Sequence, residues 1–185
     1  MTTATKVTFL RLILIPVMVV FLIVDSNKMM PFLNLEVNNF IAAVIFVIAA
    51  STDFIDGYIA RKYNQITNLG KFLDPIADKI LVISAMTYLI AVNRIYFWTV
   101  IIVIFREFVV TGIRLLAVEK GEVIAASPYG KAKTITTMIA IVLMLFNNLF
   151  IPELIVDIVW YLAVLLTLIS GLDYLFKNIN IFKEK

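Results

Sequence analysis

The sequence Asp53-Phe-Ile-Asp56-Gly57-Tyr-Ile-Ala60-Arg61 stands in the middle of a strongly apolar chain, and Gly70-Lys-Phe-Leu-Asp74-Pro-Ile-Ala-Asp78 follows it. These four aspartates are the only acidic residues between Glu36 and Glu107. On a helix, Asp53, Asp56 and Gly57 share one face, because they lie at positions i, i+3 and i+4. Gly70, Asp74 and Asp78 form a second stripe with a spacing of four. We therefore expect two carboxylate pairs on consecutive helices to converge, with glycines that allow close approach by a helix or a ligand.

Four carboxylates in apolar surroundings require positive charge nearby. Each aspartate at the centre of a membrane costs roughly 2.5 to 3.5 kcal/mol. Oxygen ligands suit hard cations such as Mg²⁺, Mn²⁺ or Ca²⁺, and two divalent ions would balance four carboxylates. Alternatively, the aspartates pair with Arg61, Lys71 and Lys79 or lie in water at a helix end. Such a salt-bridge network has no need for both glycines at these spacings.

The composition indicates a membrane protein. Of the 185 residues, 62% are apolar, against roughly 45 to 50% in soluble domains. We expect an all-α integral membrane protein with a single domain over residues 1–185. The chain has no Cys and no His, so a general base must come from Asp, Glu, Lys or Tyr. One of the four aspartates is thus favoured for proton transfer.

Six apolar segments are long enough to cross a bilayer as helices. They are Val7–Val24, Phe40–Ala60, Gly70–Val92, Tyr96–Ala117, Thr134–Phe150 and Leu154–Phe176. We read Val118–Lys133 as a polar connection and Asn93-Arg94 as a tight turn. Pro75 fits the first turn of a helix and would kink the third span if it lay deeper.

An even number of spans places both termini on one side of the membrane. Of the 16 Lys and Arg residues, all except Lys28 and Arg94 then lie on that side or at its helix ends. The positive-inside rule makes this side cytoplasmic. The four aspartates lie at the same side, so we expect a polar, metal-containing cavity open to the cytoplasm in a multi-pass protein of the cell membrane.

A second polar group follows in the fourth and fifth spans. Arg106 and Glu107 lie inside the fourth span, where charged residues normally face the bundle interior or a wet cavity. Several cations without matching acids suggest a phosphate site. Our candidates are Arg106, Arg114, Lys131 and Lys133. The alternatives are ordinary loop charges for the lysines and a structural pair with Glu107 for Arg106, although adjacent helical residues do not face each other.

The first polar region resembles the CDP-alcohol phosphatidyltransferase family. Its pattern D-x-x-D-G-x-x-A-R-x8-G-x-x-x-D-x-x-x-D has every fixed position present here, from Asp53 to Asp78. The resemblance implies metal binding by Asp53, Asp56, Asp74 and Asp78, with Asp78 as the base that deprotonates the acceptor hydroxyl. It also implies contacts to the CDP-lipid from Gly57, Ala60, Arg61, Thr67 and Thr8. The implied cofactors are two divalent cations, Mg²⁺ or Mn²⁺.

The second polar group indicates one branch of this family. The runs R-E-F-x-x-T-G-x-R from Arg106 and S-x-x-G-K-x-K-T from Ser127 are similar to the phosphatidylglycerophosphate synthase branch. The branch also has N-x-x-T-x-x-R near its N-terminus, where this chain has Thr5, Thr8 and Arg11. The reaction implied is transfer of a phosphatidyl group from CDP-diacylglycerol to the sn-1 hydroxyl of glycerol 3-phosphate, with release of CMP.

The resemblance implies a homodimer among membrane lipids, and we expect no nucleic-acid partner. Two other functions remain open. A different acceptor, such as phosphatidylglycerol, would make the protein a cardiolipin-type synthase, although a lipid acceptor needs less concentrated cationic recognition. Outside the enzymes, the four aspartates would suit a divalent-cation transporter, which takes up cation without nucleotide.

Overall fold

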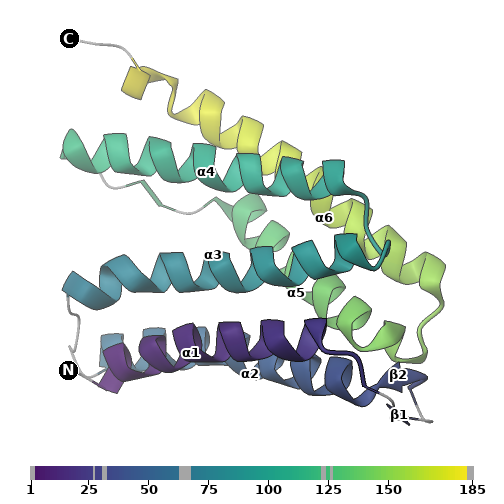
Figure 1. Ribbon diagram of the computed structural model, residues 1–185. Helices are drawn as coiled ribbons and strands as arrows, with labels where there is room; N and C mark the ends of the chain where they lie inside the picture. The colour runs from purple at the N-terminus through teal and green to yellow at the C-terminus, as the bar shows by residue number, and fades with distance from the viewer. Residues whose placement is uncertain are drawn as a thin grey trace. The chain divides into compact units, whose positions relative to one another are not determined.

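The computed structural model describes residues 3–26, 28–30, 33–62, 68–121, 124–125, 127–182; within these, the side chains of residues 3–4, 53–62, 68–69, 71, 181–182 lie outside the description. The described residues form an all-α fold with six helices. They are α1 (Thr3–Ile23), α2 (Val37–Lys62), α3 (Asn68–Ala91), α4 (Phe97–Glu119), α5 (Pro128–Leu145) and α6 (Glu153–Lys177). Two 3-10 turns, η1 (Asn147–Phe150) and η2 (Ile179–Phe182), and a minimal antiparallel pair, β1 (Met29–Met30) with β2 (Leu35–Glu36), complete it (Figure 1).

Each predicted apolar segment corresponds to one helix, so the prediction of six helices is confirmed. The turn at Asn93-Arg94 is also present, with Asn93 in the left-handed region at φ 56°, a conformation that asparagine tolerates. Pro75 lies inside α3, seven residues after its first residue Asn68, rather than at the start of the helix.

The predicted start of the fifth helix at Thr134 is wrong. The helix α5 begins at Pro128, within the segment that we read as a polar connection. Proline is favoured at the first helical position, because its missing N–H would have no partner there. The Ser127 hydroxyl accepts a hydrogen bond from the Gly130 N–H at 3.1 Å, which caps the first turn. Lys131 and Lys133 therefore lie on a helix and not in a loop.

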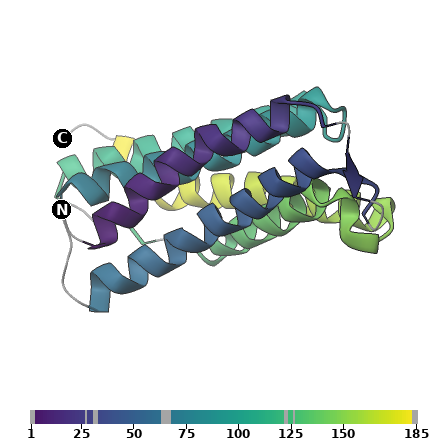
Figure 2. The ribbon, with the colours of Figure 1, turned by 60° about the horizontal axis from the view of Figure 1, so that its bottom comes forward.

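The described chain forms two compact units. The first contains residues 1–92 and 142–150, and the second contains residues 93–141 and 151–185. In the first unit α1 packs against α2 and α3 (Figure 2). One buried stripe of α1, with the spacing of three and four residues that helix packing requires, makes these contacts. It contains Thr8, Arg11, Ile15, Met18 and Leu22.

Small residues of α2 allow α1 to approach closely. Ala42 and Ala49 are fully buried at positions i and i+7. The Asn38 amide donates to the Val24 carbonyl at 2.7 Å, and Arg11 contacts Thr52. From the first contact to the second, the residue number rises along α2 and falls along α1, so the two helices run antiparallel.

In the second unit α4 packs against α6. Trp160 Nε1 donates to Thr99 Oγ1 at 3.2 Å near the start of both helices. Further along, Arg114 of α4 meets Tyr174 of α6. Because the contacts advance together along both helices, α4 and α6 run parallel, which requires α5 to return the chain between them.

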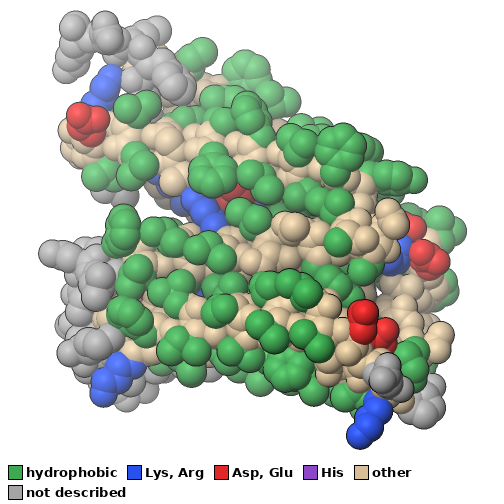
Figure 3. Space-filling model, viewed as in Figure 1, with side chains coloured by type: hydrophobic (Ala, Val, Ile, Leu, Met, Phe, Trp, Pro, Cys, Tyr) green, Lys and Arg blue, Asp and Glu red, His purple; other side chains and the backbone are tan. Residues whose placement is uncertain are grey.

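Two described helices are long and apolar enough to cross a membrane: Thr5–Ile23 and Glu153–Lys177. The others carry charges within their apolar length, as in α3 with Asp74, Asp78 and Lys79. Exposed apolar side chains nevertheless extend along the helices, as Figure 3 shows. Ile13 in α1, Phe105 in α4 and Leu162 in α6 are examples. Such surfaces are suited to lipid and not to water.

Candidate functional site

The first part of the site lies where α1 meets α3. Asp74 and Asp78 are half-buried and stand one turn apart on α3. The Thr8 hydroxyl donates to Asp74 Oδ1 at 2.5 Å. This contact fixes one oxygen of Asp74. The carboxylates of Asp74 and Asp78 place hard oxygen donors on the same helix face.

Arg11 lies one turn after Thr8 on the same buried stripe of α1. Its side chain is fully buried, and its Nε donates to Thr52 Oγ1 at 3.2 Å. Thr52 directly precedes Asp53 in α2. The stripe of α1 thus brings a buried cation to the turn of α2 that leads into Asp53, and a hydroxyl to Asp74. The sequence gave no indication of a role for Arg11 beyond its place in the N-terminal motif, whereas the structure buries it completely on this stripe.

Several predicted site residues lie wholly or partly outside the described residues. The backbones of Asp53, Asp56, Gly57, Ala60 and Arg61 lie in α2, but their side chains are outside the described residues, and Thr67 is outside them entirely. Among the described residues there is no group of three or more metal-binding side chains. Asp74 and Asp78 have the donor chemistry of a hard divalent cation, so the described half of the predicted metal site fits such an ion.

The second part of the site joins α4 to α5. Glu107 Oε1 accepts from Arg106 Nη1 at 3.1 Å and from Lys133 Nζ at 2.5 Å. The Lys133 side chain is 6% exposed, and that of Arg106 is 12% exposed. Adjacent residues on a helix do pair here, contrary to our expectation, because the long Arg106 side chain bends back toward its neighbour. Two cations and one anion leave this cluster with a net positive charge.

The guanidinium of Arg106 lies against the first turn of α5. A Cβ added to Gly130 would lie 3.2 Å from Arg106 Nη2 and 3.3 Å from Ser127 Oγ. In the described part of the chain, Nη2 has no hydrogen-bond acceptor. The start of a helix carries partial positive charge and unpaired N–H groups, so the cluster and the start of α5 together suit an anion such as phosphate.

The two other predicted phosphate ligands lie elsewhere in the second unit. Arg114 Nε donates to the Tyr174 hydroxyl at 3.0 Å, and the guanidinium carbon stands 5.5 Å from the centre of the Tyr174 ring. Lys131 is exposed in the first turn of α5. Of the four predicted cations, the structure therefore brings together Arg106 and Lys133.

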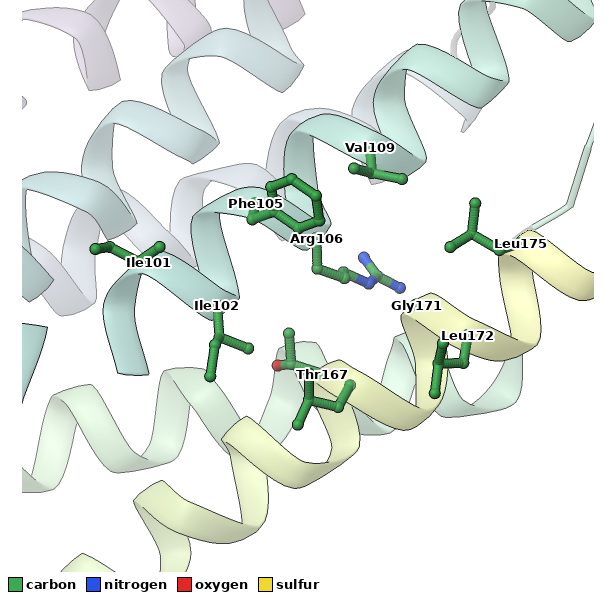
Figure 4. A pocket seen from close by; sticks show the side chains of 10 residues that line it. Ile101, Ile102, Phe105, Arg106, Val109, Thr167, Gly171, Leu172 and Leu175 are labelled. Carbon is green, nitrogen blue, oxygen red and sulfur yellow. The ribbon is translucent and has the colours of Figure 1, made fainter. Parts of the chain in front are cut away.

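Sequence reasoning missed the contribution of α6. Ser170 Oγ accepts from Arg106 Nε at 3.1 Å. Beside this contact is a pocket of about 300 Å³ lined by α4 and α6, into which the Arg106 side chain extends (Figure 4). The signal in the sequence is a stripe of polar or small residues in an otherwise apolar helix, at positions i, i+3, i+4 and i+7. They are Thr167, Ser170, Gly171 and Tyr174.

Comparisons with known proteins decide the family. The family model for CDP-alcohol phosphatidyltransferase matches residues 1–169. The chain belongs to the CDP-alcohol phosphatidyltransferase family. This is a family of membrane-bound enzymes that use divalent cations.

Similar relatives cover nearly the whole chain. A protein of Bacillus subtilis is 40% identical over 179 residues, which is 94% of this chain and 93% of the relative. One of Haemophilus influenzae is 38% identical over 174 residues, 91% of this chain and 88% of the relative. Both are named CDP-diacylglycerol–glycerol-3-phosphate 3-phosphatidyltransferase. The phosphatidyltransferase resemblance of the two sequence motifs is thus confirmed at the level of the family.

Proposed function

We propose that this chain is a phosphatidylglycerophosphate synthase, which transfers the phosphatidyl group of CDP-diacylglycerol to glycerol 3-phosphate and releases CMP. The family and the full-length similarity to relatives with that name support the activity. The observation that supports glycerol 3-phosphate as the acceptor is the cluster near the start of α5, in which Arg106 and Lys133 both pair with Glu107. This cluster is cationic and well buried, which suits a small phosphorylated acceptor more than a lipid.

The reaction is a displacement at phosphorus. An oxygen of the acceptor's primary hydroxyl forms a bond to the phosphatidyl phosphorus, and the bond from that phosphorus to the CMP oxygen breaks. The hydroxyl proton passes to a carboxylate oxygen of Asp78, and CMP leaves with the electron pair. Bound divalent cations would neutralise the pyrophosphate and the charge that develops on the leaving CMP.

The residues of the chain have separate tasks in this scheme. Asp53, Asp56, Asp74 and Asp78 would hold two divalent ions, Mg²⁺ or Mn²⁺. Gly57, Ala60, Arg61 and Thr67 would contact the CDP moiety of the donor. Arg106, Arg114, Lys131 and Lys133 would bind the phosphate of the acceptor, with Arg106 and Lys133 best placed among them. Thr8 was expected at the donor, and its hydrogen bond makes it a support for Asp74 as well.

Thr8→Val tests this support for the metal site. Loss of a hydrogen bond behind a metal ligand lowers metal affinity by about 10- to 100-fold. We expect Thr8→Val to require a correspondingly higher Mn²⁺ concentration, both for half-maximal rate and for thermal stabilisation of the purified protein by Mn²⁺. Thr8→Ser keeps the hydroxyl and is the matched control. Unchanged Mn²⁺ stabilisation in Thr8→Val would exclude a role for Thr8 at the metal site.

The proposed architecture is a single domain of six membrane spans, with the aspartate cavity open to the cytoplasm and both termini on that side. The antiparallel pair α1 and α2 and the parallel pair α4 and α6 support it, because helices that cross in turn must alternate in direction. We expect the protein to form a homodimer in the cell membrane.

Cysteine labelling tests the topology directly, because the chain has no Cys of its own. Lys28→Cys and Lys120→Cys replace exposed residues that the scheme places on opposite sides of the membrane. In intact cells, a membrane-impermeant maleimide should label Lys28→Cys and reach Lys120→Cys only after permeabilisation. Labelling of both in intact cells would contradict six spans and the cytoplasmic site.

An acceptor assay tests the function. Purified protein in vesicles with CDP-diacylglycerol and Mg²⁺ or Mn²⁺ should convert radiolabelled glycerol 3-phosphate into lipid. Labelling of lipid from phosphatidylglycerol instead would identify a cardiolipin-type synthase. Cation uptake into vesicles without CDP-diacylglycerol, and without labelled lipid, would identify a transporter.

A further inference from the structure

The helix α6 presents a polar stripe to α4. Thr167 and Ser170 are fully buried, and Tyr174 is 2% exposed. Two residues of this stripe accept hydrogen bonds from arginines of α4: Ser170 from Arg106, and Tyr174 from Arg114. The Thr167 and Ser170 hydroxyls donate to carbonyls of α6 itself, at 2.7 and 3.1 Å, so their burial leaves no donor without a partner.

The hydroxyl of Ser170 is fixed in direction. It donates to the Thr167 carbonyl at 3.1 Å, so its hydrogen points along its own helix. The oxygen is then left to accept from Arg106 Nε at 3.1 Å. Because the donor role of the hydroxyl is already taken, Ser170 can only act as an acceptor toward the guanidinium.

Gly171 makes room for the aliphatic part of the same arginine. A Cβ at position 171 would lie 3.1 Å from Arg106 Cγ and 3.9 Å from Arg106 Cβ. The first distance is shorter than an ordinary van der Waals contact, so a side chain at this position would require the arginine stem to shift by a few tenths of an ångström. Figure 4 shows the Arg106 side chain extending from α4 toward Gly171 of α6.

These contacts act on different atoms of one side chain. Ser170 holds Nε, Glu107 holds Nη1, and Gly171 accepts the stem. The atom Nη2 is left at the start of α5, against Gly130. A guanidinium held in this way has its remaining N–H groups directed before an anion arrives, which lowers the entropy lost on binding.

We propose that Ser170 and Gly171 are positioning residues. They hold the Arg106 side chain so that its Nη2 group, at the start of α5, binds the phosphate of the acceptor. This inference rests on the proposed function and assigns a task to α6 in acceptor recognition. It predicts that changes in α6 alter the affinity for glycerol 3-phosphate without altering the chemistry of the donor.

The first test compares Michaelis constants. Ser170→Ala and Gly171→Ala should each raise the KM for glycerol 3-phosphate by about tenfold, as expected for loss of one charge-assisted contact. The KM for CDP-diacylglycerol and kcat should stay within a few-fold. Thr87→Ala is the control for removal of a helical hydroxyl, because Thr87 Oγ1 donates only along its own helix, to the Ile83 carbonyl. If both substrates were affected equally, the α6 residues would be structural and the inference would be wrong.

A double-mutant cycle separates this inference from the proposed function. Arg106→Lys keeps a cation but has no N–H at the position of Nε, so Ser170 has nothing to hold. Ser170→Ala should then add no further increase in KM to Arg106→Lys, whereas two independent effects would multiply. Multiplied effects would overturn the role of α6 and leave the acceptor site intact. An unchanged KM in Arg106→Lys alone would overturn the acceptor site itself.

Discussion

Asp78→Asn is expected to lower the turnover rate by at least about 100-fold, since a general base contributes about 10² to 10⁴ in rate. The substitution keeps the shape of the side chain but removes its charge, and with it both the proposed base and one metal ligand. Asp78 is half-buried on α3, one turn after Asp74 and on the same helix face. The rate of CMP release from CDP-diacylglycerol measures the effect.

Asp157→Asn is the matched control for this change. Asp157 is a half-buried helical aspartate, and its carboxylate pairs with Arg94 at 2.9 Å near the start of α6. Asp157→Asn should alter thermal stability more than turnover. If Asp78→Asn kept more than about a tenth of the normal rate, the assignment of Asp78 as the base would fail.

Lys133→Ala is expected to raise the KM for glycerol 3-phosphate by about 10- to 150-fold, which corresponds to loss of a contact worth roughly 1.5 to 3 kcal/mol. Lys133 is buried against Glu107, so its removal leaves one cation and one anion where there were two cations and one anion. A dianionic acceptor should lose most of its attraction to a cluster with no net charge. The KM for CDP-diacylglycerol should stay within a few-fold, because the proposed metal site would hold its pyrophosphate.

Two further variants complete this comparison. Lys120→Ala removes the same charge from an exposed position at the end of α4 and should leave both Michaelis constants unchanged. Arg61→Ala should show the opposite bias, with the larger effect on CDP-diacylglycerol. An equal effect of Lys133→Ala on both substrates would mean that the cluster serves the donor or the fold.

The sequence predicted the helices well because their length and apolar content leave few alternatives. It failed at the start of α5, where charge density suggested a loop. The local chemistry of Ser127 and Pro128, a helix cap followed by the favoured first residue, was the better signal there. An amphipathic or polar first turn does not exclude a helix when its cap is present.

The sequence also identified the residue types of the site better than their partners. The pattern of carboxylates around Asp74 stands out in an apolar chain, and so does Arg106. Ser170, which contacts Arg106 directly, is 64 residues away from it in the sequence. Lys133, which pairs with Glu107, is 26 residues away from that glutamate. Which polar side chain of one helix meets which side chain of another depends on helix direction and rotation, and the composition of a single span does not determine these.

Isotope transfer tests the central claim most directly. Glycerol 3-phosphate labelled with ¹⁸O at its primary hydroxyl, given to the purified protein with CDP-diacylglycerol and Mn²⁺, should yield a lipid product with the label in its bridging phosphodiester oxygen. One unlabelled CMP should be released for each molecule of product. Release of CMP without ¹⁸O in the lipid, or no CMP release at all, would contradict direct transfer of the phosphatidyl group to glycerol 3-phosphate.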